Sequence, residues 1–207
     1  MKKIVGNEVN MDLNAEQIFR DFVIELQKQI NIQKTAGIDI DNCRDIPWTE
    51  IVKEAFSEIG RIIEGIKVYA TGHDGEYLLD VLWDSTENEK HGPILGVESE
   101  WGNIKDVEED FYKLMYVKCR FKVLVYSSTS EVNRLELQRM IKDGLINFDQ
   151  HLIGEQYLFV DMNNFEPWRI TTVGFIVTQA TLKNRKAIEL SNICSVEWDD
   201  KIKNYIL

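Results

Sequence analysis

Three carboxylates occupy positions where the surrounding residues predict buried strands. Asp80 lies inside YLLDVLW, the otherwise apolar run 77–83. Glu98 and Glu100 lie two residues apart near the end of ILGVESEW, the run 94–101. Because alternate residues of a strand project from the same face, we expect these two glutamates to point together. An ionised carboxylate inside a buried strand is costly unless it is paired or binds a cation.

The chemistry that these acids support depends on whether their two strands are neighbours. If the strands pair, Asp80, Glu98 and Glu100 converge, and their repulsion raises their pKa values unless a cation neutralises them. An all-oxygen site of this kind favours a hard divalent ion, Mg²⁺ or Mn²⁺. Two plainer interpretations stay open. Asp80 would pair with a basic residue on an edge strand, or the two glutamates would form a solvated strand face.

The elements that must position these acids follow from hydrophobic periodicity and turn residues. Helices are predicted over 15–32, from Pro47 to about 65, over 106–118, and from Thr129 or Ser130 to about 145. Strands are predicted over 66–70, 77–83, 94–101, 122–126, 157–161 and 170–177. The residues after 183 carry no clear pattern.

This order predicts an α/β protein with a mixed β-sheet and helices on both faces. Tight turns between the first strands imply antiparallel pairing, whereas the strand–helix–strand stretches imply parallel pairing. No repeat, low-complexity run or linker interrupts the 207 residues, so we expect a single domain. Within it, 1–47 is a helical extension, 48–127 contains the three acids, and 128–207 adds a helix and strands that complete the sheet.

The succession of Asp80, then Glu98-Ser99-Glu100 at the end of the next strand, then a helix and the strand KVLVY, resembles the restriction-endonuclease-like PD-(D/E)XK nuclease superfamily. The resemblance covers about residues 48–127 and implies a restriction-endonuclease-like core. It implies Mg²⁺- or Mn²⁺-dependent hydrolysis of DNA that leaves 5′-phosphates, with Asp80 and Glu98 holding the metal. Glu100 stands at the motif lysine position, as in a minority of type II restriction endonucleases, and would hold a second ion or orient the attacking water.

Two further residues follow from the resemblance. Lys113, on the predicted helix 106–118, is the candidate to replace the motif lysine, and its plainer role is a surface ion pair with Asp110 or Glu109. The superfamily often adds an acid from the helix before the first core strand. Glu58 is the candidate for that acid, because it borders the apolar face of the predicted helix.

The charge balance limits the partners. The chain carries 24 Lys and Arg against 35 Asp and Glu, for a formal net charge of −11. This balance argues against non-specific coating of nucleic acid and against adhesion to an anionic membrane. It leaves room for a local DNA-binding groove, for which the small basic clusters at 118–122 and 183–186 are the candidates.

Two other functions compete with the nuclease hypothesis. An acidic chain without the motif lysine also fits a catalytically inactive relative, an immunity- or inhibitor-like interaction module with a protein partner. A metal-dependent hydrolase of small phosphates differs from the nuclease only in its substrate. Binding of Mg²⁺ or Mn²⁺ separates the interaction module from both enzymes.

Several other classes of protein lack their motifs here. No run of about 18 apolar residues predicts a membrane span, and the start of the chain lacks the apolar stretch of a signal peptide. The three cysteines form no CxxC pair, and neither a GxSxG elbow nor a GxxxxGK[ST] loop occurs. These features predict a reduced, cytoplasmic protein. If it cuts both strands of DNA, a two-fold homodimer is expected.

Overall fold

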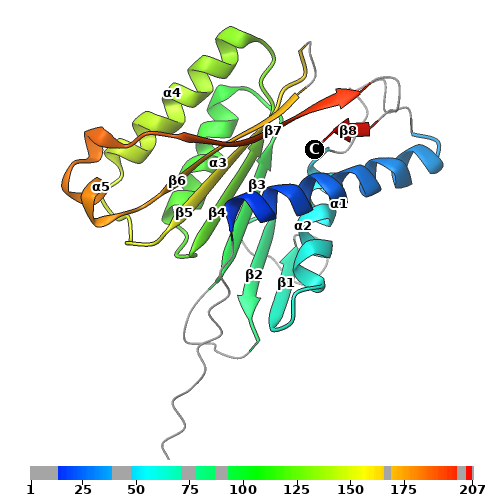
Figure 1. Ribbon diagram of the computed structural model, residues 1–207, viewed down its shortest axis with the longest axis horizontal. Coiled ribbons are helices and arrows are strands. Elements are labelled where there is room, and N and C mark those ends of the chain that lie inside the picture. The colour runs from blue at the N-terminus through cyan, green and yellow to red at the C-terminus, as the bar shows by residue number, and fades with distance from the viewer. Residues whose placement is uncertain are drawn as a thin grey trace, which may run out of the picture.

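The computed structural model describes residues 14–38, 48–70, 78–86, 93–165, 169–199 and 204–206. It contains a mixed sheet of seven strands, extended at one edge by a three-residue eighth strand, together with five α-helices (Figure 1). The strands lie in space in the order of the chain. They are β1 (Ile66–Ala70), β2 (Val81–Ser85), β3 (Leu95–Glu100), β4 (Phe121–Tyr126), β5 (Gln156–Met162), β6 (Arg169–Ile176), β7 (Ser191–Asp199) and β8 (Asn204–Ile206).

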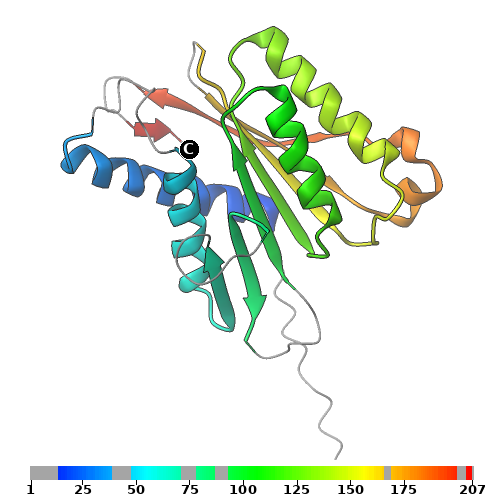
Figure 2. The ribbon, with the colours of Figure 1, turned by 180° about the vertical axis from the view of Figure 1, so that it is seen from behind.

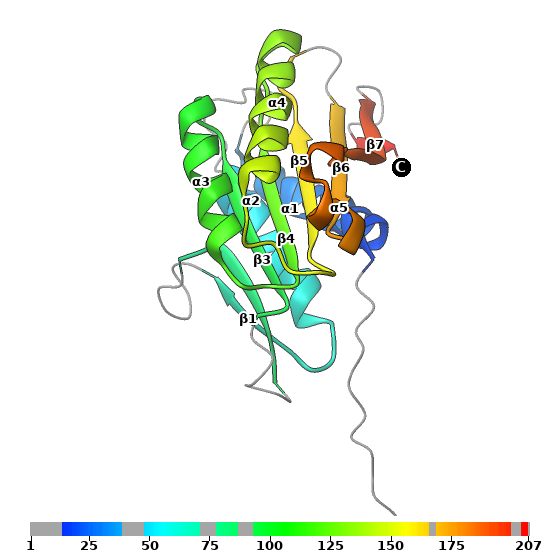
Figure 3. The same ribbon diagram turned by 90° about the vertical axis from the view of Figure 1, so that its left-hand side faces the viewer.

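Helices cover both faces of the sheet, as the sequence predicts. The helices are α1 (Ala15–Thr35), α2 (Trp48–Arg61), α3 (Ile104–Tyr116), α4 (Glu131–Asn147) and the short α5 (Gln179–Lys183), which is followed by a 3-10 turn, Arg185–Ala187. α1 lies in front of the sheet in Figure 1, and α3 and α4 come to the front in the reverse view of Figure 2. Figure 3 shows α3 and α4 side by side along β3, β4 and β5.

The sheet separates two apolar cores, and β4 shows how one strand serves both. All six of its residues are buried. Val123 and Val125 pack in the core under α1 and α2, whereas Leu124 and Tyr126 pack in the core under α3 and α4. This alternation is the period of two that a strand imposes on its side chains. A strand buried on both faces is the reason that its sequence is almost continuously apolar.

The direction of the strands confirms the division expected from the connections. β1, β2 and β3 pair antiparallel, and β3, β4 and β5 pair parallel because α3 and α4 return the chain to the same end of the sheet. From β5 to β8 the pairing is antiparallel again.

Two predicted boundaries are wrong by several residues, and one unassigned stretch forms strands. The second strand was expected over 77–83, but β2 begins at Val81, so Asp80 precedes the strand instead of lying inside it. The second helix ends at Arg61 rather than near residue 65, because Gly65 takes a positive φ of 82° in the turn that reverses the chain into β1. The tail that carried no pattern forms β7 and β8.

The described helices differ from membrane-spanning helices in length or composition. None of them combines the length and the apolar character needed to cross a membrane.

Candidate functional site

Asp80 and Glu98 come together at the end of the β2–β3 ladder. The register pairs Val81 with Val97, so Asp80 and Glu98 each lie one residue beyond that pair. Asp80 Oδ2 accepts hydrogen bonds from the backbone N–H of Ser99, at 2.9 Å, and from the Ser99 hydroxyl, at 2.8 Å. The convergence of these two acids from neighbouring strands agrees with the sequence prediction, although Asp80 reaches the site from a bend rather than from a strand.

Lys113, on α3, forms ion pairs with Glu98 and with Asp110. Its Nζ lies 2.7 Å from Oε1 of Glu98 and 3.0 Å from Oδ1 of Asp110, one helical turn earlier. The Glu98 side chain is 2% exposed, whereas that of Lys113 is 36% exposed. Lys113 therefore pairs with Asp110 on its own helix, as its plainer role predicts, and it also contacts the buried Glu98. We name Asp80, Glu98, Asp110 and Lys113 the acid cluster.

Burial and the repulsion between neighbouring acids raise the pKa values of the buried carboxyl groups in this cluster. Burial raises the pKa of Glu98 to about 8; the charges of Asp110 and Asp80 add to the effect, and Lys113 opposes it. Burial also raises the pKa of Asp80, although its hydrogen bonds from Ser99 act in the other direction. Burial lowers the pKa of Lys113, but its two carboxylate partners outweigh that effect and hold the pKa above its ordinary value.

Lys53 is a second cation near the cluster, and sequence reasoning missed it. It is buried on α2, its Nζ lies 2.6 Å from Oε1 of Glu50, and its charge lowers the pKa of Asp80. With Glu50 included, four carboxylates share two lysines. If all are ionised, the region carries two excess negative charges. The sequence feature that could have identified Lys53 is its position among the apolar residues of 51–56.

The structure places Glu100 and Glu58 in other environments. Glu100 Oε1 accepts the backbone N–H groups of Trp101, at 2.8 Å, and Gly102, at 2.6 Å, and so fixes the turn after β3. Glu58 pairs with Arg61 on the outer part of α2. Neither carboxylate is thus held beside Asp80 and Glu98.

The donor set fits a divalent cation held by two carboxylates, but not by three. Among the described residues, no three acidic, histidine or cysteine side chains are grouped so that they could hold a metal ion. Mg²⁺, however, is commonly bound through one or two carboxylates, with water and substrate phosphate as its other ligands. Asp80 and Glu98 supply such a pair of carboxylates.

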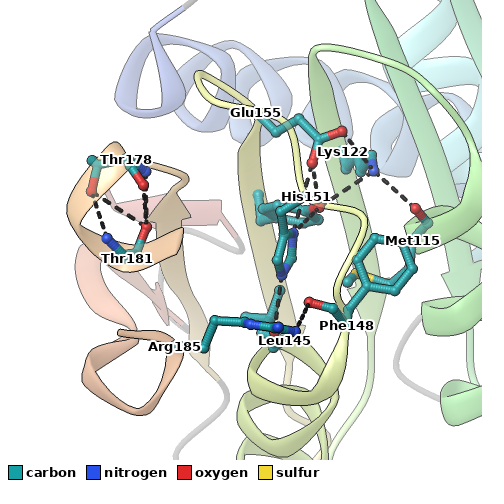
Figure 4. A network of polar contacts seen from close by, with 10 residues as sticks. Met115, Lys122, Leu145, Phe148, His151, Glu155, Thr178, Thr181 and Arg185 are labelled. Atoms are coloured by element: carbon teal, nitrogen blue, oxygen red, sulfur yellow. Dashed lines mark hydrogen bonds and ion pairs between the residues drawn. The ribbon is translucent and has the colours of Figure 1, made fainter. Parts of the chain in front are cut away.

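Another buried lysine, Lys122, lies in a separate polar network on the side of the sheet that α3 covers (Figure 4). Lys122 on β4 donates to the carbonyl of Met115 at 3.1 Å, to Tyr157 Oη at 3.3 Å, and to Glu155 Oε1 at 3.4 Å. Tyr157 in turn donates to Glu155 at 2.9 Å, and its hydroxyl lies 3.0 Å from Nδ1 of His151. Lys122 was expected to belong to a basic cluster for DNA, but its side chain is only 2% exposed, so it is unavailable to a phosphate backbone.

Comparisons with protein-family models, with curated proteins and with solved structures found no match.

Proposed function

We propose that this protein is a Mg²⁺- or Mn²⁺-dependent nuclease that hydrolyses phosphodiester bonds of DNA at the acid cluster. One observation carries the proposal: Glu98 on β3 lies beside Asp80 at the end of the β2–β3 ladder and contacts Lys113 of α3 at 2.7 Å. The succession β2, β3, α3, β4 supports it, because the nuclease resemblance implies two neighbouring strands that carry the acids, followed by a helix and a further strand. The lysine that the motif lacks is supplied by α3.

The reaction assigns distinct tasks to these residues. Water adds to phosphorus, the bond from phosphorus to the 3′ oxygen breaks, and protons exchanged with solvent leave a 5′-phosphate and a 3′-hydroxyl. A metal ion held by Asp80 and Glu98 would supply positive charge to the phosphoryl and leaving oxygens. Ser99 orients the Asp80 carboxylate through two hydrogen bonds. Asp110 orients Lys113 from one turn away on α3.

The charge states of Glu98 and Lys113 fit these tasks. With its pKa near 8, Glu98 holds a proton at neutral pH until a cation displaces it. Lys113 stays protonated, because its pKa is raised by the carboxylates beside it. It therefore acts as a hydrogen-bond donor to a phosphate oxygen and not as the base that activates water.

Titration calorimetry with Mn²⁺ tests the metal site. We expect millimolar or tighter binding to the wild-type protein, and we expect Asp80→Asn and Glu98→Gln to abolish it. Glu58→Gln is the matched control, because it removes a carboxylate that lies with Arg61. Supercoiled plasmid incubated with Mg²⁺ then reports cleavage, which we expect wild type and Glu58→Gln to show and the two cluster variants to lack.

One specific observation favours the second candidate function, a protein-binding module. Lys113 already pairs with Glu98, so the cluster is partly neutralised without a metal. If wild-type protein binds no Mn²⁺ and cuts no plasmid, the nuclease proposal is overturned. The alternative, an acidic module that binds a protein partner, then takes its place.

A further inference from the structure

A polar pocket of ≈ 480 Å³ lies between α4 and the strands β6 and β7. Its α4 side is formed by Glu131, Arg134 and Gln138, which share one face of the helix. It is also lined by Arg169, Thr171 and Val173 of β6, by 192–195 of β7, and by Asn163 and Phe165 between β5 and β6. The volume falls in the range of small-molecule and cofactor sites, about 300–1,000 Å³.

Two arginines face this pocket from different elements. Arg134 on α4 is held by Glu131, and Arg169 on β6 is held by Glu197 at 2.6 Å. The two carboxylates are 58% and 60% exposed, so these are surface ion pairs of the kind that stabilise a fold little. An incoming phosphate can replace such a carboxylate, because the planar guanidinium offers the same forked pair of donors to either anion.

The uncharged lining matches the rest of a nucleotide. Gln138, Asn163 and Asn192 bring amide groups, which can donate to and accept from the edge of a base. Phe165 and Ile193 bring apolar surface for the flat face of a base or for a sugar. A site for inorganic phosphate alone would need neither the amides nor the apolar surface.

The register of the sheet connects this pocket to the acid cluster. Glu100, Tyr126, Asp161, Thr171 and Ser195 lie opposite one another in a single row across β3 to β7. Thr171 and Ser195 line the pocket, and Glu98 lies two residues before Glu100 on β3. Three strand spacings of about 4.8 Å place β6 about 14 Å from β3. A stacked strand advances about 3.4 Å per nucleotide, so this separation spans about four nucleotides.

Tyr126 and Asp161, in the middle of this row, are buried, so the path runs past the carboxyl ends of β4 and β5 and not over the sheet face that α3 and α4 cover. The Asp161 carboxylate accepts hydrogen bonds from the backbone N–H and the hydroxyl of Ser128, at 3.0 and 2.8 Å. A substrate strand that passes the ends of these strands therefore meets no exposed negative charge from Asp161.

We infer that the pocket between α4 and the β6–β7 strands binds one nucleotide of the DNA strand whose phosphodiester bond lies at the acid cluster. Arg134 and Arg169 hold its phosphate, and the amide side chains contact its base. The inference rests on the proposed nuclease function for the identity of the ligand, but its test does not require cleavage.

Fluorescence anisotropy of a short fluorescein-labelled, single-stranded oligothymidylate, measured in EDTA, reports this binding directly. We expect Arg134→Gln and Arg169→Gln each to weaken the affinity about tenfold, the loss of one charge-assisted contact. We expect the double variant to weaken it further and to lower the salt slope by about one for each arginine removed. Arg20→Gln is the matched control, because Arg20 is an exposed arginine of α1, paired with Glu16 at 3.0 Å.

The outcomes separate this inference from the nuclease proposal. A double variant that keeps its circular dichroism spectrum but binds like wild type overturns the inference, and so does a wild-type protein that binds no oligonucleotide. Arginine-dependent binding without Mg²⁺-dependent cleavage supports the inference and overturns the proposed chemistry. If wild type cleaves DNA and the double variant has an unchanged KM, the nuclease proposal is supported and the inference about the pocket is overturned.

Discussion

Two lysine–carboxylate pairs lie on the same face of the sheet and differ in almost every other respect. Lys122 lies near the start of β4 and Glu155 directly precedes β5, and their side chains are 2% and 6% exposed. Glu98 lies in the second half of β3, and its partner Lys113 is 36% exposed. One pair is closed off from solvent, whereas the other has a lysine that solvent and ligands can reach.

The hydrogen bonds around each carboxylate explain the difference in its charge. Burial acts to raise the pKa of Glu155, but bonds from His151 and Tyr157 and the charge of Lys122 outweigh burial and lower it. Glu98 has Lys113 and two neighbouring acids, so burial prevails and its pKa rises to about 8. The same two residue types thus give a buried carboxylate that favours its charged form in one place and a buried acid that favours its protonated form in the other.

The largest expected effect comes from removing the lysine of each pair. Lys122→Met should lower the free energy of unfolding by about 3–5 kcal/mol, because it leaves Glu155 charged and buried without its partner. Lys113→Met should cost less than about 1 kcal/mol, because Glu98 stays protonated at neutral pH and the lysine is partly exposed. Urea unfolding at neutral pH measures both, and equal losses would contradict the distinction between the pairs.

The pH dependence of stability should have opposite sign at the two carboxylates. The folded-state pKa of Glu98 lies near 8, above its ordinary value of 4.5, so folding favours its protonated form. Its contribution is complete below pH 4.5 and is lost as the pH rises toward 8. Glu98→Gln removes this loss, and relative to wild type it should gain on the order of 3 kcal/mol between pH 5 and pH 8.

Glu155 supplies the control for this pH experiment. Its pKa is lowered in the folded protein, so its contribution is present above pH 4.5 and is lost as the pH falls below that value. Glu155→Gln should therefore change the pH dependence on the acid side only. A Glu98→Gln protein whose stability follows wild type from pH 5 to pH 8 would show that Glu98 is not the titrating group.

Two buried tyrosines, Tyr157 and Tyr126, allow a similar comparison with smaller expected changes in stability. Tyr157→Phe should cost about 1–2 kcal/mol, because its hydroxyl contacts Glu155, His151 and Lys122. The Tyr126 hydroxyl is also buried but has no hydrogen-bond partner among the described residues. Tyr126→Phe should be neutral or slightly stabilising in the same thermal or urea unfolding measurement. A larger loss at Tyr126 than at Tyr157 would be inconsistent with these hydrogen bonds.

The sequence allowed prediction of whatever depended on a local pattern. Asp80 and Glu98 could be identified because each is a charge inside an apolar run. Lys113 could be identified because it lies one turn from Asp110, but whether it also reaches Glu98 depends on how α3 lies on the sheet. β7 was missed because SNICSVEWD lacks a regular alternation of apolar and polar residues.

Residues that depend on the packing of elements were beyond the reach of the sequence. The Glu155 network could not be identified, because Glu155 and His151 lie in the connection between α4 and β5 and find Lys122 only through strand pairing. Glu58 was selected from a helical wheel, which gives its position around α2 but not the direction in which that helix faces the sheet. The turn that Glu100 stabilises could not be predicted from the sequence either, since it depends on where β3 ends.

Glu100→Gln is expected to have the smallest effect. A glutamine oxygen can still accept the N–H groups of Trp101 and Gly102, so the change in stability should stay below about 0.5 kcal/mol. Because the structure holds this carboxylate against the turn, Mn²⁺ binding and plasmid cleavage should also match wild type, whereas Glu98→Gln loses both. If Glu100→Gln instead loses cleavage to the same degree as Glu98→Gln, Glu100 must leave the turn and join the acid cluster when a cation binds, as the sequence alone predicts. The two glutamates lie two residues apart on the same face of β3, but their carboxylates have different partners. Comparing the two variants therefore tests whether function depends on the strand face alone or on where each carboxylate lies.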